Sequence, residues 1–114
     1  MMKFEKLVVW QVSFRLAEEV YAVTKSCRDY SFRDQIRRSA LSVPSNIAEG
    51  TERGSDKDSI RFLYYAKGST GELLTQIKLG VRFGYIGQNK GNQLESECYQ
   101  VSKMLVGLIK HRKI

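Results

Sequence analysis

Apolar side chains recur every three to four residues along most of the chain, which is the period of an amphipathic α-helix. In the first segment, two such series overlap. They are Leu7, Trp10, Phe14, Ala17 and Tyr21, and Leu16, Val20, Val23 and Cys27. Together they predict a helix over about residues 8–27 with a broad apolar face. We expect its aromatic side chains to be core or interface residues, and not platforms on which bases stack.

The second segment, residues 32–50, keeps one apolar phase throughout. Its apolar positions are Ile36, Ala40, Val43 and Ile47. Pro44 lies inside this segment and removes the amide that would bond the carbonyl of Ala40, so it should kink the helix. Two shorter helices with a break at Val43, the residue before the proline, are the alternative. The unbroken phase favours one kinked helix.

Residues 50–54 form a predicted turn, and Ser55 is a suitable N-cap for a third helix over residues 56–83. Its main apolar positions are Ile60, Leu63, Tyr64, Leu74, Ile77 and Val81. Gly68, Gly71 and Gly80 interrupt this helix, and each costs roughly 1 kcal/mol relative to alanine. Close approach of a neighbouring helix, within the chain or between subunits, would offset that cost. Simple tolerance of the glycines is the alternative.

The last segment also has helical spacing. Gly84 is typical of a helix C-terminus, and a loop is expected as far as Gly91. Asn92 followed by Glu95 fits a capping box, which predicts a fourth helix over residues 93–110. No strand-like alternation of useful length occurs. The pattern therefore predicts an all-α fold, an up-down-up-down four-helix bundle that forms one domain over residues 1–114.

Few residues could carry metal or nucleophilic chemistry. Cys27 and Cys98 are far apart and fall at helical core positions, so we expect buried thiols, and His111 is the only histidine. This excludes a conventional zinc site and leaves no grouping for nucleophilic catalysis. Glu49 and Glu72 could act as acid and base only if they converged, and a structural role is favoured. We therefore expect neither catalysis nor a cofactor.

The net charge of the chain indicates which class of partner it could bind. The chain has 19 basic and 12 acidic residues, a formal net charge of +7, which favours association with polyanions such as RNA or DNA. The candidate contacts are Arg28, Arg33, Arg37, Arg38, Lys78, Arg82, Lys110, Arg112 and Lys113. An ordinary solvated surface is one alternative, and a homo-oligomeric scaffold that docks an acidic protein partner is another. No apolar run is long enough for a membrane span and no secretory signal is evident, so we expect a cytoplasmic protein.

Several stretches together resemble one protein family. They are Leu7-Val8-Val9-Trp10-Gln11, Gln35-Ile36-Arg37-Arg38-Ser39-Ala40, Pro44-Ser45-Asn46-Ile47-Ala48-Glu49-Gly50 with the following Arg53-Gly54-Ser55, and Ala66-Lys67-Gly68-Ser69-Thr70-Gly71-Glu72-Leu73. The chain resembles the bacterial four-helix-bundle family encoded in intervening sequences of 23S rRNA genes, some members of which are named ribosomal proteins. The resemblance spans essentially the whole chain. It extends to the accessory variability protein of diversity-generating retroelements.

The resemblance implies more about architecture than about activity. Members of the family look like homopentamers without enzymatic activity or cofactor, and the related accessory protein is a basic pentamer that binds nucleic acid and a reverse transcriptase. Residues of the family-like motifs receive a structural role: Pro44, Asn46, Glu49, Gly50, Arg53, Gly54, Ser55 and Arg61. We expect Asn46 and Glu49 to cap or pair near the turn, and Arg61 to pair with a carboxylate on a neighbouring helix. The Gly/Asn-rich run 84–92 departs from the family pattern.

Overall fold

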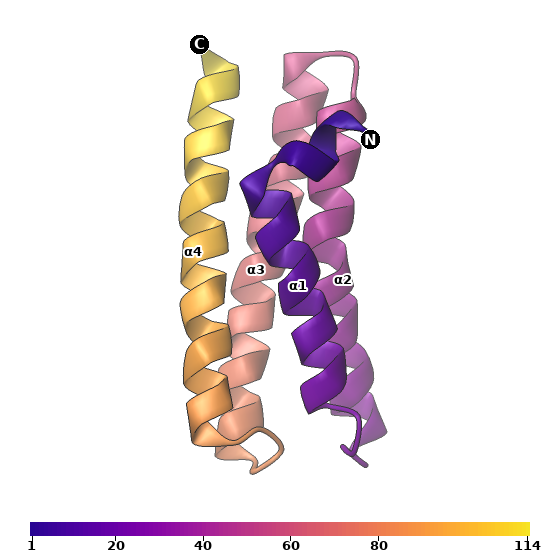
Figure 1. Cartoon of the computed structure of the whole chain (residues 1–114), viewed down its shortest axis with the longest axis vertical. Coiled ribbons are helices and arrows are strands. Elements are labelled where there is room, and N and C mark those ends of the chain that lie inside the picture. The colour runs from indigo at the N-terminus through magenta and orange to yellow at the C-terminus, as the bar shows by residue number, and fades with distance from the viewer.

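The computed structural model describes all 114 residues as four helices that run alternately up and down (Figure 1). The helices are α1 (Val8–Val23), α2 (Tyr30–Glu52), α3 (Asp56–Arg82) and α4 (Gln88–Lys113), and a short 3-10 turn, η1 (Lys3–Lys6), precedes them. α1 and α3 each pack against both α2 and α4, in a bundle of 44 × 22 × 20 Å. The predicted all-α four-helix bundle is confirmed.

The two ends of the bundle carry different parts of the chain (Figure 1). We call the end that holds the α1–α2 and α3–α4 connections the distal end. The terminal end holds both chain termini and the α2–α3 connection. This distinction matters below because the candidate basic residues are divided between the two ends.

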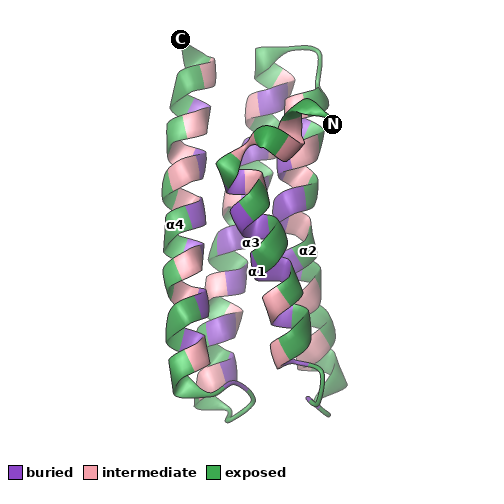
Figure 2. Cartoon of the chain, viewed as in Figure 1, coloured by how far each residue is buried: buried purple, intermediate pink, exposed green.

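One side of each long helix is buried, as Figure 2 shows. The largest fully buried side chains include Leu16, Ile36, Ile47, Leu63, Leu73, Ile77, Leu94 and Leu105. They belong to one continuous cluster that draws on all four helices. Removal of this apolar surface from water is the main force that holds the helices together.

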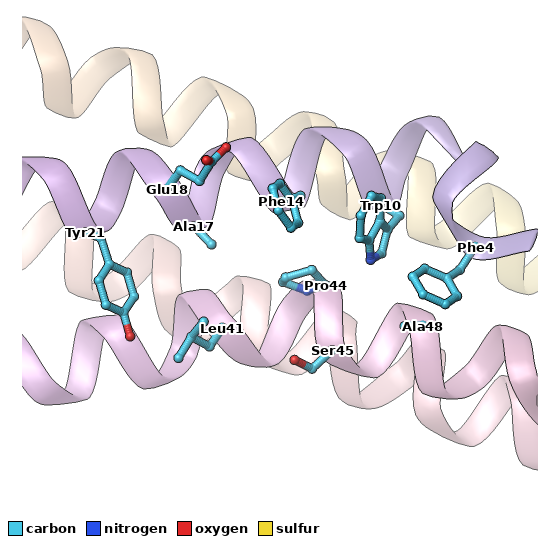
Figure 3. Close-up of a pocket in the computed structure, with 10 residues that line it drawn as sticks. All are labelled: Phe4, Trp10, Phe14, Ala17, Glu18, Tyr21, Leu41, Pro44, Ser45 and Ala48. Carbon is cyan, nitrogen blue, oxygen red and sulfur yellow. The ribbon is translucent and has the colours of Figure 1, made fainter. Parts of the chain in front are cut away.

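The predicted apolar face of α1 is confirmed for the second series and wrong for the aromatic residues Phe14 and Tyr21 of the first. Leu16 and Val20 of the second series are buried together with Val12, whereas Phe14 and Tyr21 of the first series are exposed. A helix in a bundle buries a stripe of its surface, and the two series together cover more than that stripe. The aromatic series therefore lies at the edge of the core, on the side that faces α2 (Figure 3).

The buried stripe of α3 also differs from the predicted one. Thr70 continues the stripe, because its hydroxyl donates to the carbonyl of Ala66 at 2.8 Å and so needs no other partner. Tyr64, assigned to the stripe from its spacing, is exposed, and so is Tyr65. A pattern of apolar residues alone is interrupted at Thr70. The residue can still be buried, because its hydroxyl is hydrogen-bonded within the helix.

Both ends of the first connection differ from the prediction. α1 ends at Val23, where the buried Thr24 hydroxyl donates back to the carbonyl of Val20 at 2.7 Å. Cys27 lies beyond the helix but stays buried, as expected. α2 begins at Tyr30 because the side chain of Asp29 accepts the amide of Phe32 at 3.1 Å and caps the helix. α2 then continues as a single helix through the buried Pro44, as predicted, and includes Gly50.

The predicted start of α4 at residue 93 is wrong, since the helix begins at Gln88 with Gly87 as its cap. The amides of Tyr85 and Ile86 both donate to the carbonyl of Gly80, at 2.8 and 3.1 Å, which ends α3 and reverses the chain within a few residues. Gly84 has a φ of 81°, a left-handed conformation that suits glycine, so its predicted role is confirmed. The capping box at Asn92 is not used.

Close helix approach is confirmed at one of the three α3 glycines. A Cβ added at Gly80 would lie 2.7 Å from Cδ1 of Ile86 and 3.0 Å from Cζ of Phe32. No neighbouring atom lies within 4 Å of the corresponding positions at Gly68 and Gly71. Contact between subunits at those two glycines stays a prediction.

Alanine substitution of two glycines in the same helix should therefore have opposite effects. Gly80→Ala is expected to lower the free energy of unfolding by about 1–3 kcal/mol, because the added methyl displaces Phe32 and Ile86. Gly71→Ala is the matched control and should raise it by up to about 1 kcal/mol through helix propensity alone. Urea denaturation of both variants measures the difference. Equal effects would contradict the close packing at Gly80.

Candidate nucleic-acid interface

The candidate basic residues do not form one patch. Those near the start of α2 and the end of α3 gather toward the distal end: Arg28, Arg33, Arg37, Arg38, Lys78 and Arg82. Those at the end of α4 lie at the terminal end: Lys110, Arg112 and Lys113. The long axis of the bundle is 44 Å, so the two groups act as separate surfaces.

Arg37 has a structural partner at two of its three side-chain nitrogens. Its Nε donates to the hydroxyl of Thr24 and its Nη2 to the carbonyl of Tyr21, both at 3.0 Å. Its guanidinium also lies 4.4 Å from the centre of the Tyr21 ring. A cation at these carbonyls suits the negative end of the α1 dipole. Arg37 therefore ties α1 to α2, and these donors are already in use.

Three more distal cations have acidic partners. Arg33 lies 3.6 Å from Asp34, and its guanidinium is 4.7 Å from the centre of the Tyr30 ring. Lys78 on α3 pairs with Glu95 on α4 at 2.5 Å, and this hydrogen bond raises the pKa of Lys78. Lys90 pairs with Glu19 of α1 at 2.7 Å. These pairs reduce the charge that the distal end offers to a ligand.

Arg28, Arg38 and Arg82 are the distal arginines that remain without partners. All three are exposed, and none takes part in the five ion pairs of the structure. A free guanidinium presents a planar set of donors that matches a phosphate group. The prediction of phosphate contacts is therefore best supported at these three positions.

An aromatic cluster at the distal end was not found by sequence reasoning. The ring centres of Phe32, Phe83 and Tyr85 lie 5.1 to 6.1 Å apart. The hydroxyl of Tyr85 donates to a carboxylate oxygen of Asp29 at 2.8 Å. This bond lowers the pKa of Asp29 and raises that of Tyr85, and it joins the α3–α4 connection to the cap of α2.

Three basic residues of the terminal end lie against aromatic rings. Lys113 donates to the hydroxyl of Tyr64 at 3.1 Å and lies 5.5 Å from the centre of its ring. Arg53 and Arg61 lie 4.4 and 5.0 Å from the ring centre of Phe62. These cation–π contacts occupy faces of the Phe62 and Tyr64 rings.

The residues of the family-like motif form the corner between α2 and α3. A Cβ at Gly50 would lie 3.0 Å from the carbonyl oxygen of Ser59, so only glycine fits where the helices meet. Glu49 pairs with Arg53 at 3.3 Å, near the turn as predicted. Ser55 caps α3 by accepting the amide of Asp58 at 3.2 Å, and Gly54 lies in the turn before it.

Two details of that motif differ from the prediction. Arg61 lies 3.5 Å from Asp58 of its own helix, and not near a carboxylate of a neighbouring helix. Asn46 donates to the carbonyl of Ser42 one turn earlier, at 2.9 Å, and caps nothing. In both cases the side chain pairs with a residue three or four positions earlier on its own helix.

The two candidate catalytic carboxylates do not converge. Glu72 accepts the hydroxyl of Ser39 at 2.7 Å and so links α3 to α2. Glu49 lies ten residues after Ser39 on α2, a rise of about 15 Å along the helix. Burial raises the pKa of the Cys98 thiol to about 12, which keeps it protonated and unreactive. No three His, Cys, Asp or Glu side chains gather into a metal-ligand group.

A groove of about 650 Å³ runs between α1 and α2 (Figure 3). Trp10 packs between Phe4 and Phe14, with ring centres 5.3 and 4.9 Å away. The lining residues are Phe4, Trp10, Phe14, Ala17, Glu18, Tyr21, Leu41, Pro44, Ser45 and Ala48. Phe14 is 45% exposed and Leu41 is 48% exposed. The aromatic series of α1 therefore forms an open apolar surface.

Comparison with known proteins agrees with this architecture. Residues 5–107 match the model of a family described as 23S rRNA-intervening sequence protein. The chain is also similar to the crystal structure of a protein of unknown function from the S23 ribosomal protein family of Bacteroides thetaiotaomicron VPI-5482. The two share 25% sequence identity with a TM-score of 0.86, over 90% of this chain and 99% of that one. No curated protein matches the sequence significantly. None of the four helices has a stretch both long and apolar enough to cross a membrane.

Proposed function

Because this chain belongs to the family of 23S rRNA-intervening sequence proteins, we propose that it is a non-enzymatic, homo-oligomeric bundle that binds RNA or DNA through its distal end. The observation that carries the proposal is the exposure of Arg28, Arg38 and Arg82 at that end without acidic partners. Arginines of this kind neutralise phosphates and release counterions. Phosphate contacts carry no base information, so the binding is not sequence-specific.

Self-association is the second part of the proposal, and the apolar groove between α1 and α2 is its contact surface. Phe14 and Leu41 leave apolar surface in water that a second copy would cover. Glu18 is the one charged residue of the lining, and a second copy with a net charge of +7 offers cations to pair with it. Five copies are expected from the family resemblance. An oligomer carries several copies of the distal end, and simultaneous binding by these copies raises the affinity for a single polyanion.

Charge reversal at the distal end tests the binding. A variant with Arg28→Glu, Arg38→Glu and Arg82→Glu should bind a labelled 30-nucleotide RNA at least about tenfold more weakly than the wild type at low salt, and with a smaller dependence on salt. Fluorescence anisotropy titrations at two salt concentrations measure both quantities. Undetectable wild-type binding at low salt would end the proposal.

A matched variant controls for overall charge. Lys57→Glu, Lys110→Glu and Lys113→Glu make the same change in net charge at the terminal end. This variant should lose distinctly less affinity than the distal one. If the two variants lose affinity equally, the distal end is not the interface, and binding depends on net charge alone.

A further inference from the structure

We propose that the distal end selects single-stranded over duplex nucleic acid, with Phe83 and Tyr30 as the surfaces on which unpaired bases stack. The inference rests on the proposed function and specifies its ligand. Both rings are more exposed than buried, Tyr30 at 59% and Phe83 at 55%. Tyr30 is the first residue of α2 and Phe83 directly follows α3, so both belong to the distal end.

The packing beneath the Phe83 ring holds it in place. Phe83 lies against Phe32 and Tyr85, at centre distances of 6.1 and 5.8 Å. Phe32 in turn fills the space beside Gly80, and Tyr85 is fixed by its hydrogen bond to Asp29. A ring that is already positioned loses little conformational freedom when a base stacks on it.

Each ring has a free cation next to it in the chain. Arg28 lies two residues before Tyr30, and Arg82 directly precedes Phe83. Neither arginine has an acidic partner, whereas the nearby carboxylate of Asp29 is occupied by Tyr85 and by the amide of Phe32. Alternation of aromatic rings with unpaired cations is the arrangement that binds single strands, because bases stack while phosphates meet the charges.

The terminal end offers the contrasting case within the same molecule. Lys113 lies over the Tyr64 ring there, and two arginines lie over Phe62. At the distal end Arg33 lies over one face of the Tyr30 ring, at 4.7 Å, and Tyr30 is still 59% exposed. No cation lies over Phe83, so its face is open to a base. A duplex keeps its bases stacked inside and can use only the arginines, which is why the distal end should distinguish the two forms.

Anisotropy titrations with single-stranded oligo-dT and oligo-U and with a duplex of equal phosphate number test the inference. The double variant Phe83→Ala, Tyr30→Ala should bind both single strands about tenfold or more weakly, with the salt dependence retained and duplex affinity changed less than about threefold. If the alanine variant does not fold, Phe83→Leu replaces it, because leucine keeps an apolar side chain without a ring face. Phe83→Leu should also weaken single-strand binding. Tyr65→Ala removes a similarly exposed tyrosine from the other half of α3 and should have no effect.

The outcomes separate this inference from the proposed function. Equal wild-type affinity for single strand and duplex, or unchanged single-strand affinity in the folded ring variants, overturns stacking while charge-dependent binding stands. Loss of single-strand affinity in Tyr65→Ala to the same extent also overturns it. No binding of any of these polymers at low salt overturns both.

Discussion

Replacing Leu63 by alanine is expected to lower the free energy of unfolding by about 2–5 kcal/mol. Leu63 is fully buried on the inner side of α3. It lies where α2 packs closely on α3 at Gly50, since a Cβ added at Gly50 would be 3.5 Å from its Cδ2. The backbones of two helices limit collapse around the deleted methyl groups, so most of the cavity should persist. A loss in the upper half of that range is expected for this reason.

Leu79→Ala is the control for the same helix, because Leu79 is exposed and its truncation leaves no cavity. It should change the free energy of unfolding by less than about 0.5 kcal/mol. Chemical denaturation followed by circular dichroism gives both values. Similar denaturation midpoints for the two variants would show that the helical phase assigned to α3 is incorrect.

The sequence predicts those features of the fold that depend on residues close together in the chain. The cap at Ser55 depends on an amide three residues away, and the left-handed Gly84 on its own lack of a Cβ. The start of α4 was not predictable in this way. It follows from the reversal in which Tyr85 and Ile86 donate to the carbonyl of Gly80, and that reversal is stabilised by packing of Ile86 against α3.

The sequence predicts which basic residues belong to the candidate site. It does not predict which of them are paired with other side chains or carbonyls. Nothing in the sequence indicates that Arg37 is paired, because its partners, Thr24 and Tyr21, lie 13 and 16 residues earlier, at the C-terminal end of α1. The cluster of Phe32 with Phe83 joins residues from the start of α2 and the end of α3. A count of basic residues gives the sign of the surface, but contacts between helices decide which charges are available.

A substitution in the α1–α2 groove should reduce the size of the particle. We expect the wild type to have a mass several-fold above 13.1 kDa by light scattering, with five copies favoured by the family resemblance. Leu41→Arg should reduce it toward 13.1 kDa, because a charge in the contact would have to be buried. Leu41 is half exposed in the single chain, so the helix itself tolerates the change. Tyr99→Arg, on the exposed side of α4, is the control and should leave the mass unchanged.

The same variant tests the link between assembly and binding. Leu41→Arg adds a positive charge, which by itself would strengthen attraction to a polyanion. If several distal ends act together on one strand, the dissociated variant should nevertheless bind a long RNA at least about tenfold more weakly than the wild type. Its affinity for an oligonucleotide too short to reach two subunits should not fall. A wild type that is a single 13.1 kDa chain at high concentration would remove the assembly and this cooperative effect together.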